Sequence, residues 1–247
     1  ASPSTFTIPA GGTQTVTFTM NVTGKQLNTY SFNRVTFSAA GGVAPDVSLP
    51  VAVKPVISDL PKHFNYQQST NAFTTNETIR TIAANSITAQ VYSLQKSTRV
   101  NAMVVAGQFH ITTITVPANT KQLIVDMRFT TAQDVDIYVY KDDMLVCEGS
   151  SSITLDHCLI DSPPAGTYQI YVFNYTGTKV HGEDLISYNY AIIPNSNDGS
   201  LIVNVPSVNS GGDLTVTHQI NVPGSQPGDS WYGIYTLRDT NTNITFG

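Results

Sequence analysis

Charged residues are scarce in this sequence of 247 residues. Asp, Glu, Lys and Arg together make up 12%, about half of the roughly 25% that is typical of soluble domains. Twelve basic residues stand against 17 acidic ones, and the basic residues are scattered. Because nucleic-acid binding needs clustered Lys and Arg, we expect no nucleic-acid partner. The chain also lacks a membrane-length apolar run and a polybasic tract, so we expect no membrane partner.

Cysteine is almost absent, with Cys147 and Cys158 as the only two. In extracellular β-rich domains, such a closely spaced pair is typical of a disulfide that closes a hairpin and contributes roughly 3 kcal/mol. The alternative is a metal site, but Cys147, His157 and Cys158 do not form a recognised ligand pattern. We therefore predict a Cys147–Cys158 disulfide.

Catalytic motifs are missing as well. A subtilisin-type site needs Ser in a Gly-Thr-Ser-Met-like run and His in His-Gly-Thr, and the sequence contains neither. The run Gly228-Asp229-Ser230 is superficially similar to a chymotrypsin nucleophile, but Trp231 and Tyr232 replace the glycines of the oxyanion loop. The five histidines are isolated, without a His-Glu-x-x-His motif. The chain by itself is therefore predicted not to be an enzyme.

Short segments of alternating apolar and polar residues recur along the whole chain, separated by Gly, Pro and Asn. No stretch keeps a helical period, so an all-β fold is predicted. The clearest strand runs from Asp134 to Tyr140, with Val135, Ile137 and Val139 on one face. A second alternating strand runs from Gln169 to Tyr175, and we expect the two to pair in one antiparallel sheet.

Turn-rich boundaries divide the chain into tandem β-sandwiches. We predict a small sandwich, or part of one, at 1–55 and a linker with a short strand pair at 56–94. Because fewer than sixty residues are few for an independent core, either a preceding segment of the first module is missing or the module is supported by a neighbour. A central jelly-roll or Greek-key sandwich follows at 95–193 and a further β-sandwich at 194–247. The expected strands are Phe6–Pro9, Thr15–Val22, Tyr30–Phe37 and Val47–Val53, then Phe109–Val116, Gln122–Phe129, Val135–Tyr140, Gln169–Phe173 and Tyr188–Ile193.

An internal repeat links the two ends of the chain. The run from Gly11 to Gly24 matches the run from Gly211 to Gly224, with Gly-Gly, Thr-Val-Thr and Asn-Val at equivalent positions. Convergence of two turn–strand–turn units is one interpretation. Two related immunoglobulin- or Fn3-like modules flanking a different central domain is the interpretation we favour.

Two runs in the central stretch carry a family resemblance: Asp134-Val-Asp-Ile-Tyr-Val-Tyr140 and Ala165-Gly-Thr-Tyr-Gln-Ile-Tyr-Val-Phe173. They resemble the bacterial pre-peptidase C-terminal (PPC) domain over roughly residues 95–193. The run from Ser2 to Thr17 resembles the fibronectin-III-like domain that follows the catalytic domain of subtilisin-like proteases. The last module, with Trp231, is similar to the terminal β-module of such proteases.

The resemblance implies the C-terminal region of a secreted bacterial subtilisin-like serine protease, with the catalytic domain of the same polypeptide as a partner. The chain begins at Ala1 without a signal peptide, so we expect a processed or excised piece. PPC domains act in folding, secretion or binding of insoluble protein, and a related domain of clostridial collagenases binds collagen and uses calcium. This implies Asp134, Asp136 and Asp142 as calcium ligands. From the pattern alone, these carboxylates are a solvated face.

Aromatic side chains on the polar faces of the two central strands predict a binding face, because exposed aromatics are typical anchors of protein interfaces. The alternative is that they pack against the other sheet. We expect an accessory region that aids binding of insoluble protein, folding, secretion or stability of the protease; the alternative function is a cell-surface adhesin or matrix-binding segment without a protease. The predicted face comprises Tyr138, Tyr140, Tyr171, Phe173 and Tyr175.

Overall fold

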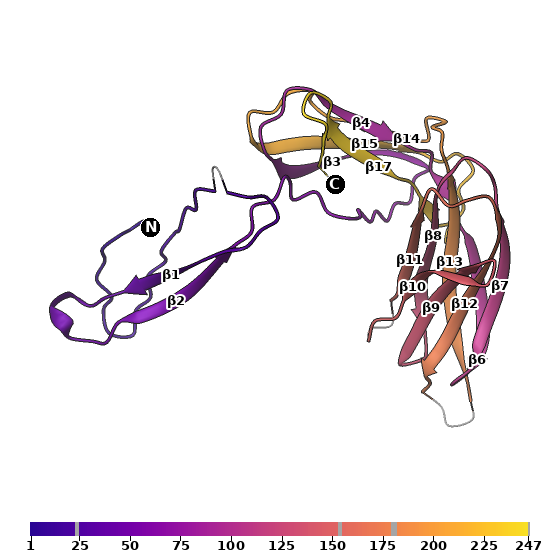
Figure 1. Cartoon of the computed structure of the whole chain (residues 1–247), viewed down its shortest axis with the longest axis horizontal. Coiled ribbons are helices and arrows are strands. Elements are labelled where there is room, and N and C mark those ends of the chain that lie inside the picture. The colour runs from indigo at the N-terminus through magenta and orange to yellow at the C-terminus, as the bar shows by residue number, and fades with distance from the viewer. Residues whose placement is uncertain (23–24, 153–154, 179–181, 247) are drawn as a thin grey trace. The chain divides into compact units, whose positions relative to one another are not determined.

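The computed structural model describes residues 1–22, 25–152, 155–178 and 182–246. It confirms the all-β prediction: the described residues form antiparallel strands, and the single short helix is the 3-10 turn η1 (Ala40–Gly42). No helix in these residues is long and apolar enough to cross a membrane. The chain divides into two compact units, Ala1–Asp59 and Leu60–Gly247, which are drawn in Figure 1 and described separately below.

The first unit is built around one two-stranded antiparallel sheet, β1 (Ser31–Phe37) and β2 (Val47–Val53). Phe6 and Phe18 each pack edge-to-face on Phe37, with ring centroids 6.2 Å apart. The strands predicted at 6–9 and 15–22 do not form; the described part contributes only the bridge between Ser2 and Thr17. Among its described residues this unit contains a single sheet, whereas a sandwich needs two sheets packed face to face.

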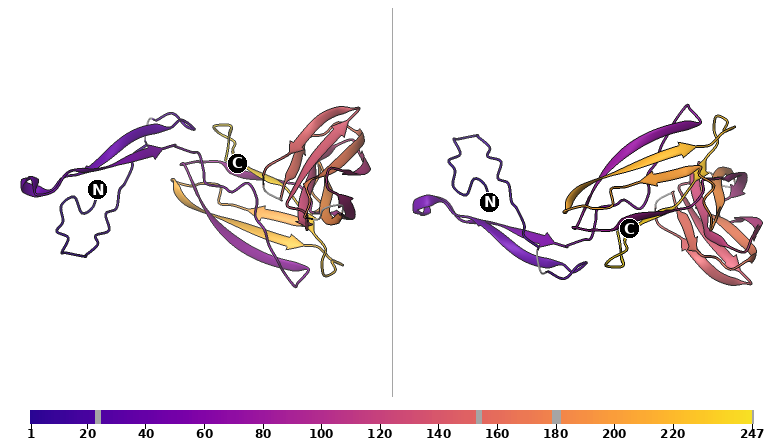
Figure 2. Two further views of the ribbon diagram at one scale, coloured as in Figure 1. Left: turned by 90° about the horizontal axis from the view of Figure 1, so that it is seen from below. Right: turned by 90° about the horizontal axis from the view of Figure 1, so that it is seen from above.

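Residues 98–194 form an eight-stranded jelly roll, as predicted. One sheet has the order β10-β9-β12-β7 and the other β11-β8-β13-β6, so the first strand lies beside the eighth and the second beside the seventh. Figure 2 shows the strands of this sandwich from two further directions. The strands are β6 (Thr98–Val105), β7 (Phe109–Val116), β8 (Thr120–Thr130), β9 (Asp134–Lys141), β10 (Met144–Gly149), β11 (His157–Asp161), β12 (Gly166–Thr176) and β13 (Glu183–Pro194).

The jelly-roll core follows from the alternation in its strands. Val135, Ile137 and Val139 of β9 are fully buried, and β12 directs Ile170 and Val172 to the same interior. The two strands pair antiparallel, as the sequence predicted. Because one face of each strand fills the interior, the alternate residues of β9 and β12 are left on the outer face of the sheet.

The segment predicted to be a linker with a strand pair has a different role. It supplies β3 (Ala72–Thr81), which pairs with β15 (Gly212–Asn221), and β4 (Ile87–Val91), which pairs with β17 (Tyr235–Asp239). Two sheets result, β14-β15-β3 and β18-β17-β4, and they belong to one module built from 60–97 and 195–246. We call it the split module. Its remaining strands are β5 (Gln95–Lys96), β14 (Leu201–Asn204), β16 (Trp231–Tyr232) and β18 (Ile244–Thr245).

A buried histidine lies between the two sheets of the split module. His218 on β15 is 2% exposed, with Nδ1 3.1 Å from the Tyr66 hydroxyl and Nε2 3.0 Å from the Tyr235 hydroxyl. The Tyr66 hydroxyl donates to Glu77 Oε1 at 3.0 Å, and the Phe64 ring lies 5.0 Å from the imidazole. The segment 60–71, which has no strand, is therefore attached to the module through its aromatic side chains.

The split module packs directly on the jelly roll. Tyr232 and Ile234 lie against a small core that includes Ile124 and Ile193. The Tyr232 hydroxyl donates to Asp126 Oδ2 at 2.7 Å and lies 3.2 Å from the Asn189 amide, which donates to it. These contacts combine burial of apolar side chains with hydrogen-bonded polar groups, so the jelly roll and the split module are packed against each other within the second unit.

Candidate aromatic binding face

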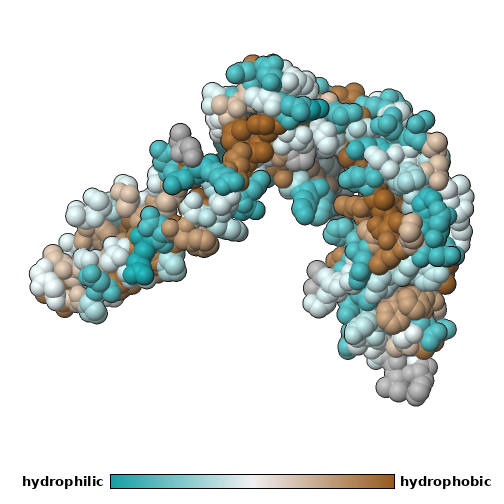
Figure 3. Space-filling model, viewed as in Figure 1, coloured by the Kyte–Doolittle hydropathy of each residue, from teal (hydrophilic) through white to brown (hydrophobic). Residues whose placement is uncertain are grey.

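The outer face of the β10-β9-β12-β7 sheet carries a continuous group of aromatic side chains. We call it the aromatic face and define it by residues on three adjacent strands: Phe109 and Ile111 on β7, Tyr171, Phe173 and Tyr175 on β12, and Tyr138 and Tyr140 on β9. All five residues predicted for binding lie on it. Brown apolar surface is visible over the jelly roll in Figure 3.

Strand register brings these side chains together in rows. Ile111 is paired with Tyr171, which is paired on its other side with Tyr138. Phe109 is likewise paired with Phe173, and the residue beyond it on β9 is Asp136. Because directly opposed residues on one sheet face lie about 5 Å apart, each row forms a contact across the strands.

Ring geometry shows that the rows are also joined to one another. Phe109 stacks on Phe173 at 4.5 Å and meets Tyr171 edge-to-face at 5.8 Å. Tyr140 meets Tyr171 at 5.1 Å, and Phe173 meets Tyr175 at 5.9 Å. Aromatic pairs prefer these offset and perpendicular arrangements, so the rings support one another in fixed positions.

An open hollow of about 280 Å³ lies among the rings of Phe109, Tyr140 and Tyr171. Its lining also includes Gln169 and Asp143. Phe109 is 50% exposed and Tyr175 is 62% exposed, whereas the rings between them are half-buried by their neighbours. The face therefore offers apolar ring surface together with hydrogen-bonding groups, without being covered by the opposite sheet. This excludes the interpretation that these rings pack in the core.

Phe109, Ile111, Asp143 and Gln169 were not predicted as residues of the binding face. The strand Phe109–Val116 was predicted correctly, and its alternation already places Phe109 and Ile111 on one face. What the sequence did not contain was the order of strands, which puts β7 next to β12. Asp143 reaches the hollow only because of the β9–β10 turn, where it adopts a positive φ of 61°.

The three predicted calcium ligands do not come together. Asp134 and Asp136 lie at the start of β9, whereas Asp142 lies beyond its end, about 25 Å away for eight residues of extended strand. Asp142 instead pairs with Lys141. The described residues contain no group of three or more His, Cys, Asp or Glu that could hold a metal ion. One calcium ion therefore does not fit this set.

Asp136 nevertheless lies in an acidic environment. The residue is 6% exposed, and its carboxylate accepts a hydrogen bond from the Tyr138 hydroxyl at 3.1 Å. Burial raises the pKa of Asp136, and the negative charges of Asp134, Asp156 and Glu148 act in the same direction. Burial, followed by the hydrogen bond to Asp136, raises the pKa of Tyr138 to about 12. Tyr138 is thus a neutral donor held by a carboxylate at neutral pH.

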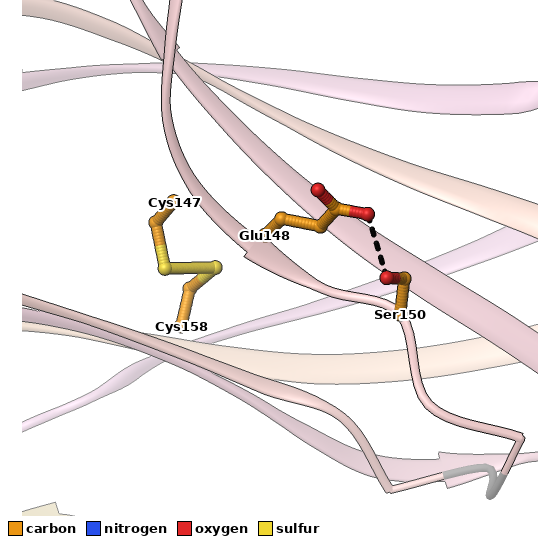
Figure 4. Close-up of a disulfide and its surroundings, with 4 residues drawn as sticks. All are labelled: Cys147, Glu148, Ser150 and Cys158. Atoms are coloured by element: carbon orange, nitrogen blue, oxygen red, sulfur yellow. Dashed lines mark hydrogen bonds between the residues drawn. A yellow bond between two sulfur atoms is a disulfide. The ribbon is translucent and has the colours of Figure 1, made fainter.

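The predicted disulfide is present. Cys147 on β10 and Cys158 on β11 are joined, with their Cα atoms 5.8 Å apart (Figure 4). The two strands are edge strands of opposite sheets, so the bond ties the sheets together along one side of the jelly roll. Next to it, the Ser150 hydroxyl donates to Glu148 Oε1 at 2.6 Å.

Ser230 is held by contacts with the start of the jelly roll. Its hydroxyl accepts a hydrogen bond from Arg99 at 3.3 Å, and its carbonyl accepts from the Ser97 amide at 2.9 Å. Its neighbour Asp229 forms an ion pair with Lys96. These contacts hold in place the residues that directly precede β16, which is a structural role.

Residues 1–52 match the family model of an Fn3-like domain. This match confirms the fibronectin-III-like prediction for the first module and is consistent with a non-catalytic role. Together with the disulfide, it is compatible with an extracellular location. No curated protein matches the chain.

Proposed function

We propose that this chain is the non-catalytic accessory region of a secreted subtilisin-like serine endopeptidase, and that its aromatic face binds insoluble protein substrate. The single observation behind this proposal is the exposed, interlocked set of rings on three adjacent strands. The likeness of residues 95–193 to PPC domains connects this face with a protease. The Fn3-like match at 1–52 agrees with the module order of such enzymes.

The chemistry of the face suits a polypeptide. Tyrosines provide large, rigid contact area and a hydroxyl at the rim, the combination that is enriched in binding hot spots. Gln169 and Asp143 beside the hollow can exchange hydrogen bonds with a peptide backbone. Because the rings are held by one another before binding, little side-chain entropy is lost when a partner is bound.

A cell-surface adhesin or matrix-binding segment is the second candidate, since Fn3-like and jelly-roll modules suit that function equally. The upstream sequence distinguishes the two. A catalytic triad in the same reading frame supports the protease, and further β-modules with a surface anchor support the adhesin.

The test is cosedimentation of the purified chain with insoluble collagen and elastin, and with cellulose as a non-protein control. We expect saturable binding to a protein matrix, weakened about tenfold or more in a Tyr140→Ala/Tyr171→Ala variant, because loss of a hot spot costs at least about 2 kcal/mol. Arms with calcium and with chelator examine the calcium dependence that the resemblance implies.

A matched control is available on the opposite sheet. Phe129 on β8 is 53% exposed, close to the 50% of Phe109, but does not belong to the aromatic face. Phe109→Ala should weaken binding and Phe129→Ala should not. Equal losses in the two variants, or no binding to either protein matrix, would contradict the proposed function.

A further inference from the structure

Strand β7 is an edge strand with one neighbour, β12. Its eight residues, Phe109 to Val116, include no charged residue, no proline and no glycine, and its register with β12 is unbroken. Phe109 and Ile111 are about half exposed. The strand is therefore free of bulges over these residues, open and rich in β-branched residues, which are the properties that favour pairing with another strand.

The hydrogen bonds between β7 and β12 show which backbone groups of β7 point away from the sheet. The Asn174 amide donates to the Gln108 carbonyl at 3.1 Å, and the Asn174 carbonyl accepts from the Gly107 amide at 2.8 Å, so both backbone groups of Asn174 face the start of β7. Since hydrogen-bonded and non-hydrogen-bonded pairs alternate between antiparallel strands, every second residue of β7 turns its N–H and C=O away from β12. These residues are Phe109, Ile111, Thr113 and Thr115, whose side chains lie on the outer face of the sheet.

Each of the other three edges of the jelly roll carries at least one feature that opposes pairing. β10 has a bulge between Leu145 and Cys147 and is tied by the disulfide to β11, which is only five residues long. β6 carries Arg99, whose guanidinium is bonded to Asn189 and to Ser230 of the split module. Bulges, short length and charge are the usual means of blocking an edge. Among these edges, β7 alone has none of them.

We propose that the edge of β7 binds an extended segment of unfolded polypeptide, which adds to the sheet as a fifth strand. This inference rests on the proposed function and specifies how the substrate is held. Backbone hydrogen bonds from the four outward-facing residues would provide affinity independent of sequence. Side chains of the added strand alternate, and those on the outer face lie beside Phe109 and Ile111, which favours apolar residues at every second position.

Two observations favour a substrate strand over a second copy of the chain. The free edge is continuous with the aromatic face through the stacked Phe109 and Phe173 rings, so one polypeptide can use the edge and the rings together. Each copy of the chain has a formal net charge of -5, which disfavours pairing between copies.

The experiment uses the full chain and a fluorescein-labelled α-lactalbumin that has been reduced and carboxymethylated, so that it stays unfolded. Native α-lactalbumin is the folded control. Thr113→Pro removes an outward N–H that β12 does not use, and Thr113→Val keeps that N–H. By fluorescence anisotropy, we expect Thr113→Pro to weaken binding of the unfolded probe about tenfold or more, and Thr113→Val to change it less than about twofold.

Hydrogen exchange of the unsubstituted chain provides a second measurement that does not depend on the folding of the proline variant. The unfolded probe should slow exchange at the amides of Phe109, Ile111, Thr113 and Thr115. Unchanged exchange there, or equal binding by the proline and valine variants, overturns the inference. If Tyr140→Ala/Tyr171→Ala abolishes binding while Thr113→Pro does not, the edge is not used and the proposed function stands. A dimer without probe that Thr113→Pro dissociates identifies a second copy as the occupant and overturns the inference.

Discussion

His218 shows how a single buried side chain makes the protein sensitive to acid. Its two ring nitrogens both face tyrosine hydroxyls, and the neutral imidazole has one donor and one acceptor, which suits this arrangement. Burial lowers the pKa of His218 below its usual value of 6.5, and the charge of Glu77 only partly opposes this effect. The folded protein therefore favours the neutral form of the His218 imidazole.

The stability of the split module should depend on pH through this group. Because the pKa is lowered on folding, the stabilisation is complete above about pH 6.5 and is lost as the pH falls from 6.5 towards the lowered value. We expect the melting temperature to fall by about 2–4 °C between pH 7 and pH 5. Circular dichroism at the two pH values measures this change.

Two variants test whether His218 causes this pH dependence of the melting temperature. His218→Gln should reduce the difference between the two melting temperatures, whereas His63→Gln, at an exposed histidine, should leave it intact. A pH dependence that persists fully in His218→Gln would show that another group is responsible.

At the residue scale, the aromatic face was predictable and the calcium set was not. Alternation within a strand places Tyr138 and Tyr140 on one face whatever the rest of the fold does. Asp142 is separated from Asp134 by the full length of β9, and only the extent of that strand reveals this. Conversely, Glu148 approaches Asp136 because β10 pairs with β9, and Asp156 does so from the residue before β11 in the opposite sheet, which local sequence does not encode.

Among the elements, β10 and β11 depend most on the disulfide. Each pairs with a single neighbour, β10 with β9 and β11 with β8, so the bond is the covalent link between two edges. Cys158 is 1% exposed and belongs to the core, while Cys147 packs against it. Reduction of the disulfide would leave the short strand β11 held only by its backbone hydrogen bonds to β8.

Replacing both cysteines with alanine should lower the free energy of unfolding by about 3 kcal/mol, because the unfolded chain regains the entropy of the closed loop. The corresponding fall in melting temperature is about 6–12 °C for a unit of this size. Thermal unfolding with and without a phosphine reductant measures it. The reductant should lower the melting temperature of the original chain but not that of the variant; equal effects on both would argue against the disulfide.

Strands with strong alternation were predicted correctly, and weaker ones were missed. Phe109–Val116 has the predicted bounds, and β8, β9, β12 and β13 extend the predicted ranges at their ends. β6, β10 and β11 were not predicted; β10 and β11 are short, and β10 carries a bulge that interrupts its pattern. Gly11 and Gly211 both have positive φ, but β15 follows only the second, because β3 and β14 are there to pair with it.

For the whole molecule, the main departure from the predicted domains is the split module. Its halves lie on either side of the jelly roll in the sequence, and Ile87 pairs with Asp239. Sequence patterns within 60–97 predict strands but carry no information about such distant partners. The last strand of the jelly roll ends at Pro194, where Pro194-Asn195-Ser196-Asn197 is a strong turn signal.

Removing residues 1–97 should therefore disrupt the far end of the chain. Trp231, the only tryptophan, pairs with Lys96 and reports on the split module. In a fragment of residues 98–247, we expect its fluorescence to shift to longer wavelength, because β3, β4 and β5 are missing. A fragment of residues 60–247 should keep the emission of the full chain. Identical emission from both fragments would show that residues 195–246 fold without the first half.

The split arrangement also sets an order of events during synthesis. When β3 and β4 leave the ribosome, β15 and β17 have not yet been translated, so the early strands must wait while the jelly roll emerges and folds. A folded jelly roll then holds its two ends close together, which shortens the effective loop between the halves and lowers the entropy cost of joining them. The jelly roll, although it comes second in the sequence of this unit, is thus expected to fold before the split module, whose two halves can join only after β15 and β17 have been made.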